Sequence, residues 1–153
     1  MTTNPIDGAA EFFFKAAQAG DQGIPLPNDL MPPDADAAYQ VQDRLQKMWI
    51  DAGAGAIVGW KVALTSKVMQ ELLGVARPCE GAIFASRVHH GDVTVAHGDF
   101  VNIGVESEIA VRIAHDLPAT GTPYDQDNIR PGVAACMAAI TGPLITNWSK
   151  RRN

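Results

Sequence analysis

The spacing of apolar residues predicts two helices in the first third of the chain, joined by a loop. The first helix runs through Ala9–Ala19 and is capped by Asp7. The loop Asp21–Pro33 carries four prolines, which exclude regular helix, and enough apolar residues to lie on the core. The second helix begins at Asp34 or Asp36 and has the clearest pattern of the chain. Its apolar face consists of Ala38, Val41, Leu45, Met48 and Trp49.

Alternating apolar residues then predict a strand over Ala56–Leu64. One face of this strand is bulky and apolar, and therefore suited to packing. Its members are Val58, Trp60, Val62 and Leu64. The other face carries Lys61 between two very small residues, Gly59 and Ala63. These small neighbours leave room for another group to approach the ammonium.

Turns, a short strand and one more helix are predicted further along the chain. Pro78–Gly81 is predicted as a turn and Ala82–Phe84 as a short strand. A last helix is expected over Ile129–Ile140, capped by Asp125 or Asp127, and its alanines allow close packing.

The strand that carries Lys61 leads into a polar turn. Thr65 or Ser66 caps the short helix Lys67–Leu73, which Gly74 ends. The start of a helix offers unpaired N–H groups and partial positive charge, so Lys61, Thr65 and Ser66 could together hold a substrate carboxylate. The alternative is a surface lysine beside an ordinary helix cap, and the residues alone leave both interpretations open.

A second strand, Val105–Ile113, carries two carboxylates, Glu106 and Glu108. Side chains at positions i and i+2 of a strand project from the same face, so the two carboxylates stand side by side. They repel each other unless water, a shared proton or a cation separates them. A hard cation such as Mg²⁺ or Mn²⁺ takes oxygen ligands and would suit this pair. The alternative is a solvated strand face that carries two glutamates.

Three histidines, His89, His90 and His97, lie in or beside a hairpin-like stretch with turns at residues 91–92 and 98–99. Their spacing matches no usual zinc pattern, and no cysteine stands close in the sequence. We therefore expect these histidines to occupy surface turns.

The composition is that of an ordinary soluble globular protein. The chain has 153 residues, of which 46% are hydrophobic and 19% charged, which suits one domain with a core, or a large part of a longer one. The formal net charge of −5 argues against nucleic acid as a partner. Cys79 and Cys136 form no CxxC motif, which predicts a reducing, cytoplasmic setting. No stretch has the roughly 20 apolar residues of a membrane span, and the start of the chain lacks the features of a signal peptide.

Four sequence blocks, taken in order, resemble those of a known family. They are AAYQVQDRL (Ala37–Leu45), VGWKVALTSKVMQELLGV (Val58–Val75), PCEGAIF (Pro78–Phe84) and VESEIAVRIAHDLP (Val105–Pro118). With these blocks the chain resembles the 2-keto-4-pentenoate hydratase group within the fumarylacetoacetate hydrolase superfamily. The resemblance covers nearly everything up to about residue 140.

The resemblance implies an α+β fold, in which the first helices pack on a mixed β-roll or barrel-like sheet that closes on itself. In this chain residues 1–55 would be the helical part and residues 56–140 the sheet-rich part, followed by an atypical tail over residues 141–153. Family members run on past this length, which predicts a C-terminally truncated or frame-shifted member with an incomplete sheet. Strand edges and apolar core surface would then be uncovered.

The resemblance also implies a metal-dependent hydro-lyase that acts on 2-hydroxypenta-2,4-dienoate, or a related 2-oxo acid, in the catabolism of aromatic compounds. Glu106 and Glu108 would hold Mg²⁺ or Mn²⁺, and Lys61 matches the family's active-site lysine. Metal and lysine would stabilise enolate charge in the transition state. A homo-oligomer is implied as well. The alternatives are a 2-oxo-3-enoate decarboxylase, an acylpyruvate-type hydrolase or an inactive fragment.

Two departures from the family pattern bear on this function. Where several hydratases carry an acidic residue in the PxxG turn, this chain has Cys79, and the adjacent Glu80 would have to transfer the proton from a different direction. The third metal carboxylate is missing from the pattern, because the chain has no Glu after Glu108. The only later aspartates are Asp116, Asp125 and Asp127. The sequence therefore predicts the carboxylate pair of an incomplete metal site.

Overall fold

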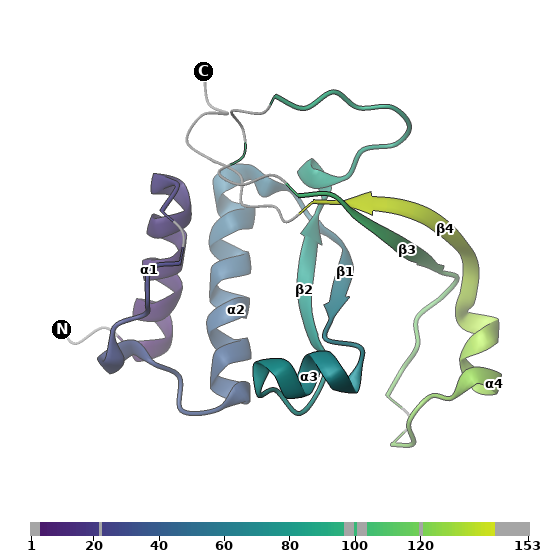
Figure 1. The fold of residues 1–153 in the computed structure, drawn as a ribbon, viewed down its shortest axis with the longest axis horizontal. Helices are drawn as coiled ribbons and strands as arrows, with labels where there is room; N and C mark the ends of the chain where they lie inside the picture. The colour runs from purple at the N-terminus through teal and green to yellow at the C-terminus, as the bar shows by residue number, and fades with distance from the viewer. Residues whose placement is uncertain (1–3, 22, 97–99, 101–103, 120, 143–153) are drawn as a thin grey trace. The chain divides into compact units, whose positions relative to one another are not determined.

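A computed structural model describes residues 4–21, 23–96, 100, 104–119 and 121–142, which fall into two compact units. The first unit, up to residue 96, contains α1 (Pro5–Ala19), α2 (Ala35–Trp49), β1 (Ile57–Ala63), α3 (Lys67–Leu73) and β2 (Cys79–Phe84) (Figure 1). The second, from residue 100 to 142, contains β3 (Glu106–Ile113), α4 (Gln126–Ile129) and β4 (Val133–Thr141). Short helical turns cover Asn28–Leu30, Ile50–Ala54, Ala85–Arg87 and Arg130–Gly132.

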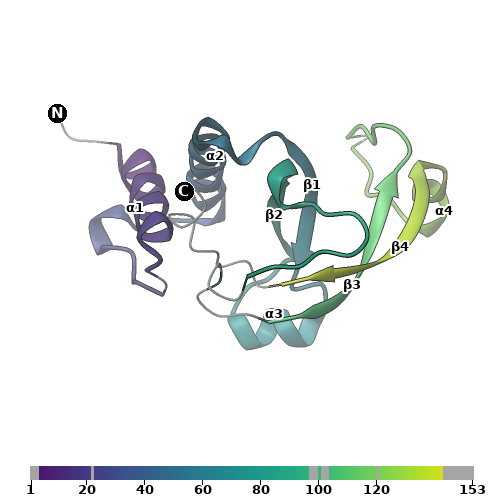
Figure 2. The same ribbon diagram turned by 90° about the horizontal axis from the view of Figure 1, so that it is seen from above.

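The two long helices α1 and α2 lie side by side in the first unit (Figures 1 and 2). α1 begins earlier than predicted, because Asn4 rather than Asp7 caps it by accepting a hydrogen bond from the Ile6 N–H at 3.0 Å. α2 begins at the predicted Asp34, whose carboxylate accepts a hydrogen bond from the Ala37 N–H at 2.8 Å. The prediction of both helices is therefore confirmed, with a correction to the start of the first.

Small residues on α1 form the centre of the core. Ala9 and Ala10 are completely buried and cluster with Val41 of α2. Partly buried residues complete this cluster, two of them from the loop between the helices: Ile6, Leu26, Leu30, Leu45 and Met48. The loop therefore lies on the core, as predicted. It lies so close to α1 that a Cβ atom at Gly8 would come within 2.8 Å of the Leu30 side chain.

The sheet of the first unit consists of β1 and β2, which pair antiparallel. The predicted strand Ala56–Leu64 is confirmed over Ile57–Ala63, and the predicted helix Lys67–Leu73 is confirmed as α3. The predicted turn Pro78–Gly81 is wrong, because residues 79–81 belong to β2 and pair with residues 63–61 of β1. Main-chain pairing with a distant strand outweighs the local turn preference of this segment.

The second unit is built on a ribbon in which β3 pairs antiparallel with β4 over its whole length. The predicted strand Val105–Ile113 is confirmed over Glu106–Ile113. The predicted helix Ile129–Ile140 is wrong, since α4 ends at Ile129 and residues 133–141 form β4. Asp125 caps α4 as predicted, but that helix has only four residues. Alanine favours a helix, but intrinsic helix propensities of ordinary residues differ by only roughly 0.7 kcal/mol per residue or less. Pairing with β3 outweighs this preference.

Large apolar side chains remain exposed in both units. Val58, Trp60 and Val62 on the bulky face of β1 are 57%, 52% and 52% exposed, so the described residues cover only part of the face that the pattern predicts to be covered. In the second unit, Ile109 and Ile140 are 77% and 79% exposed. Exposed apolar surface of this kind marks sites of interaction.

The architecture confirms the α+β class, with helices and antiparallel sheets. The described strands form two separate two-stranded sheets, and they do not form the closed β-roll that the resemblance implies. Among the described helices, none combines the length and the apolar composition needed to cross a membrane.

Candidate functional site

Lys61 lies on β1 directly opposite Gly81 of β2. Residues opposite each other in an antiparallel sheet project from the same face, so no side chain stands across from the lysine. A Cβ atom built at Gly81 would meet no other atom within 4 Å. The sheet therefore leaves open space across from the lysine.

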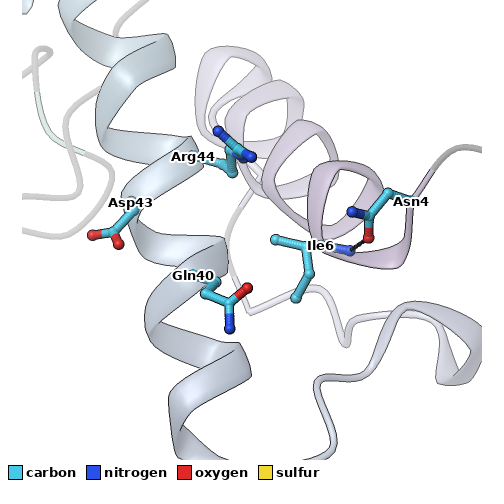
Figure 3. A pocket seen from close by; sticks show the side chains of 5 residues that line it. All are labelled: Asn4, Ile6, Gln40, Asp43 and Arg44. Atoms are coloured by element: carbon cyan, nitrogen blue, oxygen red, sulfur yellow. Dashed lines mark hydrogen bonds between the residues drawn. The ribbon is translucent and has the colours of Figure 1, made fainter.

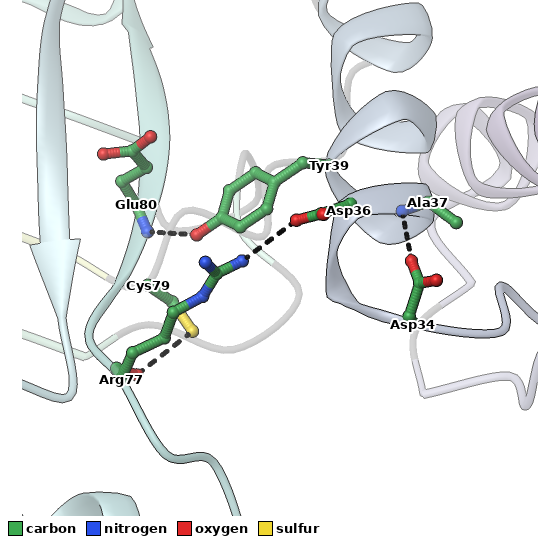
Figure 4. A network of polar contacts seen from close by, with 7 residues as sticks. All are labelled: Asp34, Asp36, Ala37, Tyr39, Arg77, Cys79 and Glu80. Carbon is green, nitrogen blue, oxygen red and sulfur yellow. Dashed lines mark hydrogen bonds and ion pairs between the residues drawn. The ribbon is translucent and has the colours of Figure 1, made fainter.

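The same register separates Glu80 from Lys61. Across the ladder, Ala63 faces Cys79 and Val62 faces Glu80. Because side chains alternate along a strand, Cys79 shares the face of Lys61, whereas Glu80 projects from the opposite face. Figure 4 shows the thiol and the carboxylate pointing apart, and Glu80 is exposed while Cys79 is half-buried. Of the two neighbours, the geometry brings Cys79 to the lysine's side of the sheet.

The turn between β1 and α3 is held by two residues that sequence reasoning missed. Leu64 adopts the left-handed conformation with φ of 57°, which costs a residue with a side chain roughly 1–2 kcal/mol. The buried side chain of Gln70 donates a hydrogen bond to the Leu64 carbonyl at 2.8 Å. A glycine at position 64 would have signalled this turn. The sequence signal that remains is one glutamine among the apolar residues of a short helix.

Thr65 and Ser66 follow this turn. Ser66 is the cap of α3, because its hydroxyl accepts a hydrogen bond from the Met69 N–H at 3.3 Å. That hydroxyl is thus engaged within the protein, and α3 has only seven residues, so its dipole is small. The predicted carboxylate site consequently depends on Lys61 and Thr65 more than on the end of the helix.

Glu106 and Glu108 lie two residues apart on β3, where Glu106 is exposed and Glu108 is half-buried. Thr141 of β4 stands opposite Glu106, and its hydroxyl donates a hydrogen bond to Oε2 of Glu106 at 3.2 Å. Ala139, a small residue, stands opposite Glu108. Mg²⁺ is commonly bound by one or two carboxylates together with substrate oxygens and water. By donor type, the pair therefore fits a divalent cation.

The histidines are only partly described. His89 and His90 lie on the exposed segment after β2, outside helices and strands, whereas His97 falls outside the described residues. Within the described part of the chain, no group of three His, Cys, Asp or Glu side chains could hold a metal ion. The carboxylate pair on β3 supplies two such side chains and belongs to no group of three within the described residues.

A shallow hollow of about 240 Å³ lies between the start of α1 and the middle of α2 (Figure 3). Its lining consists of Asn4, Ile6, Gln40, Asp43 and Arg44. Arg44 pairs with Asp7 at 3.1 Å, which offsets the positive charge beside the hollow. The hollow contains none of the predicted site residues and gives no separate indication of function.

Comparison with known proteins points to one family. The chain is 31% identical over 97% of its length to the TodF product hydratase of Pseudomonas putida. It is 35% identical over 92% of its length to 2-keto-4-pentenoate hydratase 1 of Dechloromonas aromatica, and 30% identical over 97% to the 2-keto-4-pentenoate hydratase of Paraburkholderia xenovorans. No family model matches the chain.

The matched regions amount to 55%, 54% and 55% of these three relatives, so the chain spans about half of their length. The resemblance carried by the four sequence blocks is confirmed by these matches. The chain is related in sequence to the 2-keto-4-pentenoate hydratases over nearly the whole of its own length.

Proposed function

We propose that this chain carries part of the active site of a metal-dependent hydratase. Its substrate is 2-hydroxypenta-2,4-dienoate, its keto form 2-oxopent-4-enoate, or a closely related 2-oxo acid from aromatic catabolism. Water adds across a C=C bond after the enol has isomerised to the ketone. The observation that carries the proposal is the position of Lys61. It lies on a strand across from open space at Gly81, in a chain whose relatives are named hydratases.

Lys61 supplies positive charge on one face of the β1–β2 sheet. The isomerisation from enol to ketone passes through a species with negative charge on the substrate oxygen, and an ammonium placed beside that oxygen stabilises it. Thr65 follows the same strand, and its hydroxyl can donate a hydrogen bond to the substrate carboxylate, with Ser66 beside it contributing its main-chain N–H.

Glu106 and Glu108 hold the divalent cation, Mg²⁺ or Mn²⁺, in this proposal. When bound, such a cation supplies Lewis-acid stabilisation of the 2-oxo oxygen. The carboxylates contribute the negative charge that attracts the cation, and the hydroxyl of Thr141 orients the carboxylate of Glu106.

The family resemblance assigns proton transfer to Glu80, because the acidic residue that several hydratases carry at the preceding position is replaced here by Cys79. Since Glu80 projects from the face opposite Lys61, it can reach a substrate on the lysine's face only around the edge of the sheet. The candidate proton carriers on the substrate's side are therefore Lys61, the Cys79 thiol, which shares its face, and a water molecule held there. In the whole hydratase, the two described sheets would belong to one larger β-roll.

An assay of hydration tests this function directly. The loss of the dienoate's ultraviolet absorbance is followed with Mg²⁺ or Mn²⁺ present. We expect metal-dependent turnover, which Lys61→Met lowers by about 100-fold or more because the charge-stabilising group is lost. Lys67→Met, at an exposed lysine that begins α3, serves as the matched control. Absence of turnover with both Mg²⁺ and Mn²⁺ contradicts the proposal. Carbon dioxide as the main product would show that the reaction is decarboxylation instead of hydration.

Calorimetric titration with Mn²⁺ tests the metal site separately from turnover. We expect Glu106→Gln and Glu108→Gln each to weaken binding by on the order of tenfold, because each removes one anionic oxygen ligand. Glu11→Gln is the control, since Glu11 is an exposed carboxylate that pairs with Lys15 on α1. Equal affinity in all of these variants would remove Glu106 and Glu108 from the metal site.

Self-association is a further part of the proposal. One apolar face of β1 is exposed at Val58, Trp60 and Val62. A second copy of the chain would remove this apolar surface from water, which is favourable. Light scattering after size-exclusion chromatography measures the mass in solution. Trp60→Ser is expected to shift the distribution towards the monomer, and a monomeric parent protein contradicts a homo-oligomer.

A further inference from the structure

Two residues of α2, from the first sequence block, contact the strand that faces Lys61. Tyr39 and Gln42 stand three positions apart and so lie on one face of the helix. The Tyr39 hydroxyl accepts a hydrogen bond from the Glu80 N–H at 3.3 Å (Figure 4). Gln42 Nε2 donates a hydrogen bond to the Glu80 carbonyl at 2.9 Å. The helix therefore binds both main-chain groups of one residue of β2.

These contacts occupy the place of a neighbouring strand. β1 pairs along one edge of β2, and the Glu80 groups that bind Tyr39 and Gln42 serve the other edge. Strand edges with unsatisfied N–H and C=O groups pair with water or with another chain. Tyr39 and Gln42 supply one acceptor and one donor, which is the combination that a further strand would offer. We call these two residues the edge clamp.

The ring of Tyr39 is itself held by a residue that precedes β2. The Arg77 guanidinium lies over the ring, 5.4 Å from its centroid. Arg77 Nη2 also lies 3.7 Å from Oδ1 of Asp36, on the first turn of α2. Both contacts of Arg77 lie at an exposed side chain and contribute up to about 1 kcal/mol each, and together they limit the movement of the ring that carries the clamping hydroxyl.

We propose that the edge clamp, Tyr39 and Gln42, consists of positioning residues for the Lys61 site. The inference rests on the proposed function. Holding Glu80 also holds its neighbours Cys79 and Gly81, which are the residues of β2 that share the face of Lys61.

The strand register is the property that the clamp protects. A slip of one residue exchanges the two faces of a strand, and would bring a residue with a side chain opposite the lysine. Glycine at position 81 instead leaves that place open, which is the room that a small 2-oxo acid needs. The clamp thus keeps a residue without a side chain in register with Lys61.

Two variants remove the clamp with little change in size. Tyr39→Phe deletes the accepting hydroxyl and keeps the ring under Arg77, and Gln42→Glu replaces the donating amide by a carboxylate. Matched controls make the same chemical changes elsewhere. Gln40→Glu alters an exposed residue of α2, and Tyr124→Phe deletes a hydroxyl that donates to the Pro118 carbonyl.

Amide resonances report on the clamp without any ligand. We expect Tyr39→Phe to speed hydrogen exchange at the Glu80 amide by roughly five- to tenfold, as for the loss of one hydrogen bond. Both clamp variants should also shift the amide resonances of Lys61 and Gly81. The two control variants should leave these resonances in place. Unchanged exchange at Glu80, or unchanged Lys61 and Gly81 resonances, overturns the proposal.

Binding of pyruvate, the smallest 2-oxo acid, separates positioning from simple stability. In the presence of Mg²⁺, we expect both clamp variants to raise the Kd for pyruvate by about fivefold or more, while Gln40→Glu leaves it unchanged. The melting temperature of each variant is measured in parallel. A Kd that rises only in variants with a lowered melting temperature, or that does not rise at all, overturns the positioning role.

The outcome with the unchanged protein distinguishes the two proposals. If that protein binds no pyruvate and shows no turnover, the proposed function fails. The hydrogen exchange at Glu80 and the amide resonances of Lys61 and Gly81 then decide by themselves whether the edge clamp holds β2 in register. Shifts at Lys61 and Gly81 in both clamp variants, and in neither control, support it, and any other pattern overturns it.

Discussion

The segments α2 and β4 share one apolar spacing and fold differently. In α2 the apolar residues Ala38, Val41 and Leu45 stand three and four positions apart, and in β4 Val133, Met137 and Ile140 stand four and three apart. α2 is a helix that buries Val41, whereas β4 is a strand whose Ile140 is 79% exposed. Spacing alone therefore does not determine which structure forms.

The difference lies in what surrounds the spacing. The face of α2 opposite its apolar residues is polar, and the Asp34 side chain caps its first turn. In β4 the intervening residues are alanine and cysteine, so the segment has no polar face. It lies beside β3, a strand rich in Ile and Val whose main-chain groups need a partner. A stable helix needs both an apolar and a polar face, and β4 has the apolar spacing without the polar face.

Proline substitution at two adjacent positions of β4 gives the largest expected effect. Along an antiparallel strand, successive N–H groups point alternately to the partner and away from it. We therefore expect one of Ala138→Pro and Ala139→Pro to destabilise the second unit by on the order of 3 kcal/mol, and the other to have a much smaller effect. Chemical denaturation followed by the amide resonances of β3 measures the difference.

The same pair of substitutions tests the strand against the predicted helix. In a helix every interior N–H is hydrogen-bonded, so both prolines would be equally disruptive. Equal, large losses at the two positions would therefore argue for a helix. The amide resonances of α1 and α2 serve as the internal control, because they belong to the other unit.

The comparison also shows where sequence reasoning fails in physical terms. α1, α2, α3, β1 and β3 were predictable because local spacing, caps and residue types agree in each of them. The start of β2 and the whole of β4 were not, since each depends on pairing with a strand more than fifteen residues away. Pairing over such distances leaves no periodic signal in either partner alone.

Truncation of matched apolar residues in α2 and β4 gives the second largest effect. Val41→Ala removes two methyl groups from the buried cluster around Ala9 and Ala10, and we expect it to lower the free energy of unfolding by about 2 kcal/mol. Ile140→Ala alters an exposed side chain and should change it by less than about 0.5 kcal/mol. Thermal and urea denaturation measure both. A large loss from Ile140→Ala would show that this side chain is covered in solution.

The candidate site follows the same division between local and distant signals. The sequence alone brings Glu106 and Glu108 to one strand and Lys61 to another, since both statements depend on the alternation within a single strand. It could not show that Glu80 projects away from the face of Lys61, because this depends on the register with β2. Nor could it reveal that Leu64 has a strained, left-handed backbone whose carbonyl accepts a hydrogen bond from the Gln70 side chain.

Thr141→Val gives the smallest expected effect and connects the strand β4 to the proposed chemistry. Thr141 stands opposite Glu106 only because residues 133–141 are a strand in this register. Its hydroxyl donates a hydrogen bond to Glu106 Oε2 at 3.2 Å and so orients one of the two carboxylates. Outer hydrogen bonds to a metal ligand typically affect affinity by roughly 10–100-fold. For this exposed contact we expect a weaker effect, a loss of about two- to fivefold in Mn²⁺ affinity.

Calorimetric titration measures this effect beside two references. Glu106→Gln sets the larger loss that accompanies removal of the ligand itself. Thr94→Val makes the same change at an exposed threonine outside helices and strands, and should have no effect. If Thr141→Val binds Mn²⁺ as tightly as the parent protein while Glu106→Gln does not, the hydroxyl does not orient the ligand. An intermediate loss would instead show that the long-range pairing of β4 shapes the carboxylate pair as well as the fold.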